Sequence, residues 1–390
     1  MQLRRLVRGR INDDRPILLA ATTQQRAVLN RTRDRRVEVI GPAGSGKSML
    51  AAEKARKLAA DGYRTLLVCF NQPLATSLRR ELADDISAAE QRGGLQVATF
   101  HRLAEVLAVE AGLLEPHGPN LPDGWFAALP GALERAIPML PGERFHAIVI
   151  DEGQDFEAEW LLVLQQLLYE PDEGVLWVFH DPGQAIRGPD LVHQLDLPET
   201  LYLYENLRNP PSIAALAARF YTGGESIWDQ RGLLEGVDAD SAAAPRFTVI
   251  TARPGRDTVE AVRRELHRLR IVEHVRAWEL AVLSGTSAAR SDVWAARRYG
   301  DCELWNGAIR DDGTSLGLPL EDVPDEPMDD GAVLFETVRR FKGLERSVVI
   351  LCELPSEGPR LNELLYSALT RPTTELVIIA PPDLAARLRR

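Results

Sequence analysis

Glycines, a lysine and a serine stand near the N-terminus in an order that suits phosphate chemistry. They read Gly41-Pro42-Ala43-Gly44-Ser45-Gly46-Lys47-Ser48, between an apolar run at 37–40 and an alanine-rich run at 49–60. Glycines let backbone N–H groups approach phosphate oxygens, and a helix that starts here adds its positive dipole end. Lys47 offers a charge to the β- and γ-phosphates, and Ser48 offers a hydroxyl to Mg²⁺. The segment predicts a P-loop; a plain glycine turn is disfavoured because the pattern and its strand–helix context agree.

A pair of carboxylates follows the apolar run 146–150, at the start of Asp151-Glu152-Gly153-Gln154-Asp155. At the end of a strand in a P-loop sheet, one carboxylate holds Mg²⁺ and the next positions or deprotonates the attacking water. We assign these two roles to Asp151 and Glu152; an aspartate that caps the following helix is the alternative. Gln184, after the next apolar run, is expected to orient water or to sense the γ-phosphate.

Short apolar runs alternate with helical patterns along the chain. This alternation predicts parallel, doubly wound sheets, which place ligand chemistry at the carboxyl ends of their strands. The expected strands cover 37–40, 65–70, 95–100, 146–150, 175–179, 246–250, 280–283, 347–351 and 376–379, and the expected helices include 49–60, 74–86 and 158–169. The polar residues described above are therefore expected at one edge of a sheet.

A change of composition at 221–245 indicates a domain boundary. We expect a first domain at 1–220, with the P-loop and the carboxylates, and a second domain at 221–390. Small insertions are expected at about 103–145, whose part from residue 115 is rich in proline, glycine and aromatic residues, and at about 286–331, whose part from residue 308 is acidic. The length of 390 residues allows each domain to bury a core of its own.

Charge and composition restrict the partners. The net charge of −11 argues against a broadly basic nucleic-acid binder, although arginines gathered on one face would still make a local basic groove. No apolar run reaches the roughly 18 residues of a membrane span, so no membrane partner is expected. The basic N-terminus lacks the apolar segment of a secretory signal. Three cysteines lie far apart, which is typical of buried thiols in a reducing cytoplasm, so a cytoplasmic protein is expected.

The order of these segments, from about residue 22 to residue 379, resembles the UvrD/Rep-like branch of superfamily 1 helicases. The box Asp151-Glu152-Gly153-Gln154-Asp155 matches that family's Asp-Glu-x-Gln-Asp motif. The segments Asn206-Leu207-Arg208 and Tyr366-Ser367-Ala368-Leu369-Thr370-Arg371 resemble the motifs whose arginines reach the γ-phosphate. The resemblance implies further nucleotide contacts: the adenine at Gln25, the ribose at Glu345, and the γ-phosphate at Gln184, Arg208 and Arg371.

The same resemblance implies contacts with single-stranded DNA. The family places these contacts in segments at the ends of strands, and the matching residues here are Phe70, Asn71, Thr99, His101 and Thr337. Single-stranded DNA is therefore the expected partner. Family members are often joined to a nuclease or work beside one, so a nuclease or another protein partner is a further expectation.

The chain also departs from the family pattern. Leu207 stands where family members often have a tyrosine that stacks on adenine, and Pro372 stands where the final motif usually has alanine. Arg187-Gly188-Pro189 follows Gln184, where a base-stacking aromatic residue is expected. The large insertions of family members are reduced as well. The residues therefore support ATP chemistry better than they support strand separation.

The resemblance implies two RecA-like α/β domains with ATP in the cleft between them. ATP and Mg²⁺ are the expected cofactors, and the catalytic residues are expected to be Lys47, Asp151, Glu152, Gln184, Arg208 and Arg371. The expected function is an ATP-dependent DNA helicase or single-stranded DNA translocase. The alternative is a DNA-stimulated ATPase that serves as a sensor or regulatory subunit, for example beside a nuclease, without unwinding. A P-loop kinase is disfavoured by the carboxylate box and Arg371, and a non-hydrolysing scaffold by the intact Lys47 and Glu152.

Overall fold

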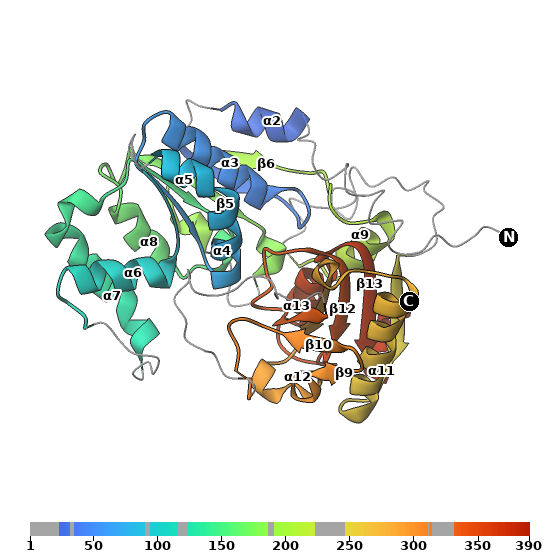
Figure 1. Cartoon of the computed structure of the whole chain (residues 1–390). Coiled ribbons are helices and arrows are strands. Elements are labelled where there is room, and N and C mark those ends of the chain that lie inside the picture. The colour runs from blue at the N-terminus through green and yellow to red at the C-terminus, as the bar shows by residue number, and fades with distance from the viewer. Residues whose placement is uncertain are drawn as a thin grey trace. The chain divides into compact units, whose positions relative to one another are not determined.

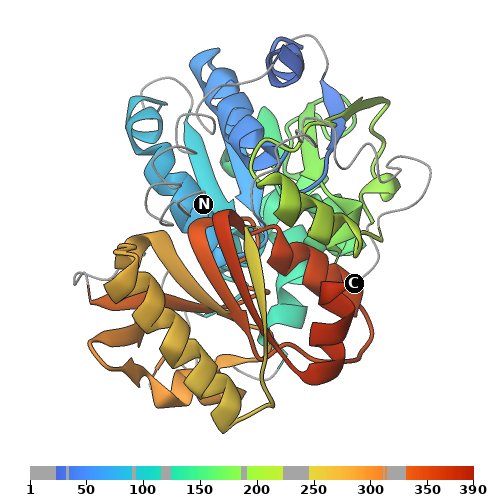
Figure 2. The ribbon, with the colours of Figure 1, turned by 90° about the vertical axis from the view of Figure 1, so that its right-hand side faces the viewer.

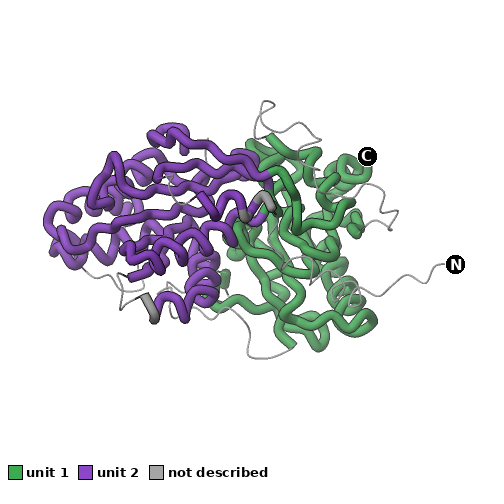
Figure 3. The backbone as a smooth tube through the Cα atoms, turned by 90° about the horizontal axis from the view of Figure 1, so that it is seen from above, with its two compact units in different colours: residues 1–20, 43–45, 204–390 green, residues 21–42, 46–203 purple. Residues whose placement is uncertain are grey.

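The computed structural model describes residues 23–31, 35–89, 94–115, 124–185, 191–222, 246–310, 312–313 and 331–390. The chain divides into two compact units, which Figure 3 shows in different colours. Unit 2 contains residues 21–42 and 46–203, and unit 1 includes residues 43–45 and 204–390. Each unit has its own sheet and its own helices (Figure 1), so the α/β class is confirmed.

The sheet of unit 2 is parallel throughout. Its spatial order is β3-β2-β4-β5-β1-β6, with β1 (Arg36–Ile40), β2 (Thr65–Cys69), β3 (Leu95–Thr99), β4 (Ala147–Ile150), β5 (Val175–His180) and β6 (Glu199–Tyr202). Every residue of β2, β4 and β5 is buried, as expected for strands that are covered on both faces. This six-stranded parallel sheet is consistent with a RecA-like P-loop fold.

Helices cover this sheet in two groups (Figure 1). On one face, α6 (Phe100–Glu110), α7 (Trp125–Ala136) and α8 (Ala158–Gln166) share a core with apolar residues of β2, β4 and β5. Outside that core, α3 (Lys47–Ala60) packs against the same three strands. The other elements of unit 2 are α2 (Thr23–Leu29), α4 (Gln72–Glu81), α5 (Ala83–Ala89) and 3₁₀ turns at 137–139, 141–143, 153–155, 182–184 and 192–194.

Several predicted element boundaries in unit 2 are wrong. The strand expected at 65–70 ends at Cys69, and the helix expected at 158–169 ends at Gln166. The helix expected at 74–86 is two helices, α4 and α5, because the backbone leaves helical geometry at the buried Leu82, with φ −99° and ψ 13°. The strand expected at 95–100 ends at Thr99. Its side-chain hydroxyl accepts a hydrogen bond from the backbone N–H of Arg102 at 3.3 Å and caps α6, so Phe100 is helical.

Unit 1 contains a seven-stranded sheet in the order β7-β13-β12-β8-β11-β10-β9. Its strands are β7 (Phe247–Thr251), β8 (Leu280–Ser284), β9 (Arg298–Tyr299), β10 (Cys302–Trp305), β11 (Ala332–Thr337), β12 (Arg346–Cys352) and β13 (Pro372–Ala380). All neighbouring strands are parallel except β9 and β10, which are antiparallel. β9 and β10 lie in the segment expected to be an insertion, and β10 extends the sheet through its pairing with β11.

The described helices of unit 1 are α9 (Pro211–Ala218), α11 (Arg256–His267), α12 (Asp292–Ala296), α13 (Leu361–Leu369) and α14 (Pro382–Arg389). A π-helical turn at 268–272 follows α11, and 3₁₀ turns lie at 277–279 and 288–290. In Figure 2, α11 lies on one face of the sheet and α13 on the other.

The domain limit expected between residues 220 and 221 stays a prediction, while the two units meet in the chain between Leu203 and Tyr204. None of the described helices has the length and apolar character that a membrane crossing requires.

All three cysteines are free thiols and all are buried. Burial raises the pKa of the Cys69 and Cys352 thiols well above the ordinary value, so both thiols stay protonated at neutral pH. These two residues belong to the cores of their sheets, as the apolar runs around them predict.

Candidate nucleotide site and basic pocket

The P-loop connects β1 to α3 and needs glycine at two positions. Gly44 and Gly46 have φ angles of 84° and 85°, in the left-handed region that side chains disfavour. A Cβ at Gly46 would lie 2.3 Å from Nε2 of Gln25, a buried residue. Because α3 begins at Lys47, the backbone N–H groups of the loop stand at a helix N-terminus, where anions bind. The loop therefore fits phosphate, and Gln25, the expected adenine contact, lies beside it.

Lys47 is held at this loop by hydrogen bonds and by a carboxylate. Its side chain is 6% exposed, and Nζ donates to Gly41 O at 2.7 Å and to Pro42 O at 2.9 Å. The same Nζ lies 4.0 Å from Oδ2 of Asp181. The structure thus keeps the lysine charge at the loop that is expected to receive the phosphates.

Asp151 directly follows β4 and is fully buried. Burial raises the pKa of its carboxyl group to about 7, and the neighbouring charge of Glu152 adds to this effect, while Ser48 and Lys47 oppose it. Oδ1 accepts a hydrogen bond from the Glu152 N–H at 3.0 Å. Oδ2 is buried and has no hydrogen-bond partner among the described residues. A buried carboxylate oxygen in this situation fits the role of a cation ligand.

Ser48 and Asp151 are the residues that would hold Mg²⁺. Ser48 lies in the first turn of α3, and its hydroxyl is close enough to lower the pKa of Asp151. Within the described ranges, no group of three or more histidine, cysteine or acidic side chains could hold a metal alone. The ion would therefore take its other ligands from phosphate and water, as Mg²⁺ usually does. When bound, Mg²⁺ neutralises charge that develops on the phosphates.

A series of hydrogen bonds joins Glu152 to the end of β5. Glu152 has a φ of 57°, and its Oε2 accepts from Gln154 Nε2 at 2.5 Å. Oε1 of Gln154 accepts from the Asp181 N–H at 3.0 Å, and Oδ2 of Asp181 accepts from Gln184 Nε2 at 2.9 Å. Unit 2 thus brings four expected site residues together, namely Lys47, Asp151, Glu152 and Gln184. Gln154 and Asp181, which were not assigned to the site, connect them.

The two arginines expected at the γ-phosphate belong to unit 1, and both have partners there. Nη1 of Arg208 lies 3.1 Å from Oε2 of Glu345, the residue expected at the ribose. Arg371 is 1% exposed. Its guanidinium donates to three oxygen atoms of unit 1: Ser367 O at 2.7 Å, Leu344 O at 3.3 Å and Thr370 Oγ1 at 3.0 Å.

Ala43 and Gly44, at the tip of the P-loop, group with unit 1. The Ala43 N–H donates to the Tyr366 hydroxyl at 2.9 Å, and Gly44 O accepts from the Leu207 N–H at 2.9 Å. A Cβ at Gly44 would lie 2.3 Å from Oδ1 of Asn206. Neither Tyr366 nor Asn206 is an expected site residue. Both lie inside motifs that carry the family resemblance, and that is the only sequence signal for them.

The comparisons with known proteins bear on the nucleotide site. Residues 21–178 match a family model described as an AAA ATPase domain, which is a P-loop NTPase family. The match supports nucleotide binding, typically with Mg²⁺, and ATP hydrolysis. It includes the P-loop, Asp151 and Glu152, but it ends before Gln184 and bears on neither helicase activity nor DNA. No curated protein matches the chain.

Four residues expected to contact single-stranded DNA lie in unit 2 and have structural partners. Asn71 Oδ1 accepts a backbone N–H at 2.8 Å and caps α4, and Thr99 caps α6. Phe70 stacks on Trp160 with ring centres 6.0 Å apart, and His101 meets the same ring edge-on at 4.8 Å. These capping and packing roles account for the residues by themselves, so their contact with DNA stays a prediction.

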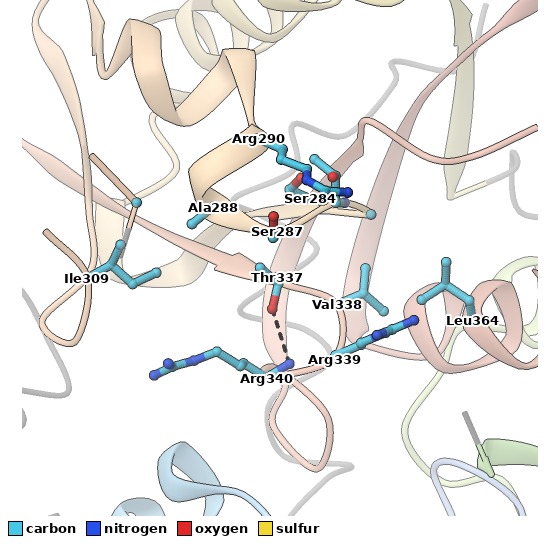
Figure 4. Close-up of a pocket in the computed structure, with 13 residues that line it drawn as sticks. Ser284, Ser287, Ala288, Arg290, Ile309, Thr337, Val338, Arg339, Arg340 and Leu364 are labelled. Carbon is cyan, nitrogen blue, oxygen red and sulfur yellow. Dashed lines mark hydrogen bonds between the residues drawn. The ribbon is translucent and has the colours of Figure 1, made fainter. Parts of the chain in front are cut away.

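Thr337, the fifth expected DNA contact, lines a pocket of about 520 Å³ in unit 1 (Figure 4). The pocket lies where β8 and β11 end, and the carboxyl ends of parallel strands are where such sheets bind ligands. Its polar lining consists of hydroxyl groups and arginines: Ser284, Thr286, Ser287, Thr337, Arg290, Arg339 and Arg340. None of its described lining residues is acidic, so the pocket favours an anion.

The three arginines of this basic pocket differ in their partners. Nε of Arg340 lies 3.2 Å from Oε2 of Glu336, a buried carboxylate whose Oε1 also accepts the Thr337 N–H at 2.8 Å. In contrast, neither Arg290 nor Arg339 forms an ion pair with any residue in the described part of the chain. The pocket is therefore lined by two positive charges that have no ion-pair partner among the described residues.

Proposed function

We propose that this protein is an ATP hydrolase of superfamily 1 helicase type that couples ATP turnover to single-stranded DNA. The observation that carries the hydrolytic part is the hydrogen-bonded series Glu152–Gln154–Asp181, which ends 4.0 Å from Nζ of Lys47. It connects the residue assigned to the attacking water with the residue assigned to the phosphates. The AAA ATPase match over residues 21–178 supports the same chemistry.

In the proposed reaction, the P-loop binds the phosphates of ATP. Lys47 donates hydrogen bonds to β- and γ-phosphate oxygens, and Ser48 and Asp151 hold Mg²⁺. Glu152 accepts a hydrogen bond from the attacking water and takes its proton, while the Gln184 amide orients that water. The γ-phosphoryl group passes to water, and ADP and phosphate leave. Burial of these groups strengthens each of the electrostatic interactions.

The arginines are proposed to complete the site. We assign residues 1–220 and 221–390 to two RecA-like domains, and we propose that Arg208 and Arg371 reach the γ-phosphate, one from each domain. The mostly parallel sheet of unit 1 supports a second domain of this kind. Gln25 would contact the adenine and Glu345 the ribose. The 3.1 Å ion pair between Arg208 and Glu345 supports a common ligand for these two residues.

The basic pocket supports the DNA part of the proposal. Thr337, Arg290 and Arg339 offer hydroxyl and guanidinium donors, which are the groups that bind phosphates of a nucleic-acid backbone. Since the chain has a net charge of −11, DNA binding would depend on this local positive charge. Affinity should therefore fall steeply as salt is added.

A DNA-stimulated ATPase that acts as a sensor or regulatory subunit, for example beside a nuclease, is the second candidate. The observation that favours it is the stacking of Phe70 on Trp160 and the use of Asn71 as a helix cap. Side chains with these roles are less available to pull on DNA strands. This candidate shares the ATP chemistry and the pocket with the first and differs from it only in the absence of unwinding.

Steady-state ATP hydrolysis with and without single-stranded DNA, at low salt and with Mg²⁺, tests the proposal. We expect DNA to stimulate the wild-type rate several-fold and Glu152→Gln to hydrolyse ATP roughly a hundredfold or more slowly than the wild type in both conditions. A wild-type rate that responds to neither DNA nor RNA would contradict the coupling. Strand displacement on a tailed duplex then separates the candidates, because the regulatory ATPase would be stimulated without displacing a strand.

A further inference from the structure

We propose that Asn209 is a positioning residue that holds the backbone around Arg371 and links it to the P-loop. Asn209 is 6% exposed and lies in unit 1, two residues before α9. It directly follows the Asn206-Leu207-Arg208 segment, and it is not among the expected site residues. The inference rests on the proposed role of Arg371 at the γ-phosphate.

The amide nitrogen of Asn209 bonds to the chain on both sides of Arg371. Nδ2 donates to Thr370 O at 3.0 Å and to Pro372 O at 2.9 Å. α13 ends at Leu369 and β13 begins at Pro372, so Arg371 lies in the short connection between a helix and a strand. Carbonyl groups at a helix C-terminus lack partners within the helix and need donors from elsewhere. One buried side chain therefore bonds to the carbonyl groups of the residues before and after Arg371.

Asn209 is the last residue of the turn 206–209, and this turn also bonds to the P-loop. Oδ1 of Asn206 accepts two backbone N–H groups of the turn, at 3.2 Å and 3.1 Å, as asparagine does in tight turns. Nδ2 of Asn206 lies 3.4 Å from Oδ1 of Asn209. The Leu207 N–H donates to Gly44 O at 2.9 Å. The turn 206–209 is thus bonded to the P-loop at one end and to the chain around Arg371 at the other.

The chemistry of the contact requires an amide. An asparagine side chain has two N–H donors, and here both carbonyl acceptors meet the same nitrogen. In Asn209→Asp, a carboxylate oxygen would face two carbonyl oxygens, and in Asn209→Ser a single donor would remain. A purely structural residue would lower stability when changed, whereas a positioning residue would lower the turnover number through Arg371.

The test measures kcat and KM for ATP in Asn209→Asp, Asn209→Ser, Arg371→Ala and the double variant Asn209→Ser/Arg371→Ala. We expect kcat of Asn209→Asp to fall roughly tenfold to a hundredfold, as misplaced catalytic groups do, with KM for ATP within about twofold of the wild type. The double variant should be no slower than Arg371→Ala alone, because Asn209 acts through that arginine. Asn362→Ser, an exchange on α13 at a residue bonded to Arg387, serves as the matched control and should keep kcat.

Each of the other possible outcomes would contradict a different part of the proposal. A double variant slower than Arg371→Ala by the full effect of Asn209→Ser would show that Asn209 acts independently of Arg371. A raised KM with unchanged kcat would show a role in binding only. If Arg371→Ala leaves kcat unchanged in an active enzyme, this inference fails while ATP hydrolysis stands. If the wild type hydrolyses no ATP, the proposed function fails first. Asn209→Ser keeps one donor, so it provides the comparison if Asn209→Asp does not fold.

Discussion

Three charged residues of the nucleotide site differ in how the protein compensates their charges. Lys47 has two carbonyl oxygens and the carboxylate of Asp181, and Glu152 has the amide of Gln154. Oδ2 of Asp151 has no such partner among the described residues. Burial, together with the neighbouring charge of Glu152, outweighs the opposing effects of Ser48 and Lys47, so the charged form is disfavoured and the pKa of Asp151 is raised to about 7. This residue gains most from a cation.

The buried charge of Asp151 is expected to lower the free energy of unfolding by an amount that depends on pH. Asp151→Asn should remove this effect. Because the pKa in the folded protein, about 7, lies above the ordinary value of 3.8, ionisation of Asp151 lowers stability as the pH rises between these values. Without nucleotide or Mg²⁺, the variant should gain roughly 2–4 kcal/mol in the free energy of unfolding at pH 8. The gain should shrink as the pH falls towards 4. Urea denaturation at several pH values measures it, and a gain that is constant with pH would refute the electrostatic explanation.

Glu152 and Lys47 should give different kinetic defects. Glu152→Gln removes the group proposed to take the proton but leaves Asp151 for Mg²⁺, so ATP affinity should stay near the wild-type value while kcat falls roughly a hundredfold or more. Lys47→Ala should abolish hydrolysis, because the charge that meets the phosphates is gone. Nucleotide titration and turnover assays measure both. Glu159→Gln on the exposed side of α8 is the control, and turnover at the wild-type rate by Glu152→Gln would disprove its assignment.

Helices and strands that follow from contiguous residue patterns could be predicted from the sequence. Contacts between residues that are distant in the sequence could not. Buried runs such as Thr65–Cys69 and Val175–His180 are apolar enough to indicate strands, and the P-loop is local in sequence. β6 contains no fully buried residue, and β10 is short, so neither gives an apolar run. The contacts of Asn209 with Thr370 and of Ala43 with Tyr366 join residues more than 150 positions apart, and no single-sequence pattern reports them.

The loops after β8 and β11 contribute Arg290 and Arg339 to the basic pocket. Arg339→Gln removes one of the two pocket arginines that lack an ion pair with a described residue, so single-stranded DNA should bind more weakly. The dependence of log affinity on log salt should become shallower by about one unit, as expected for a lost phosphate contact. Fluorescence anisotropy between low and moderate salt measures this slope. Arg256→Gln, at the exposed start of α11, is the matched control, and equal slopes in both variants would exclude the pocket as a phosphate site.

In the whole molecule, the residues proposed for ATP chemistry and those proposed for DNA binding lie far apart in the sequence. The hydrolytic carboxylates belong to unit 2, and the basic pocket belongs to unit 1, with which Ala43 and Gly44 of the P-loop also group. If the two ligands favour the same arrangement of the protein, each must raise or lower the affinity of the other by the same factor. Such reciprocity is what separates a coupled ATPase from a protein that merely binds both ligands.

The most direct test is therefore a linkage measurement on Glu152→Gln, which is expected to bind ATP without consuming it. The dissociation constant of a fluorescent single-stranded oligonucleotide is measured with and without saturating ATP and Mg²⁺, and that of ATP with and without saturating oligonucleotide. We expect both constants to change by the same factor, roughly fivefold or more. Arg371→Ala in the same background should bind both ligands but reduce that factor. Identical dissociation constants with and without the other ligand would contradict the coupling of ATP to DNA.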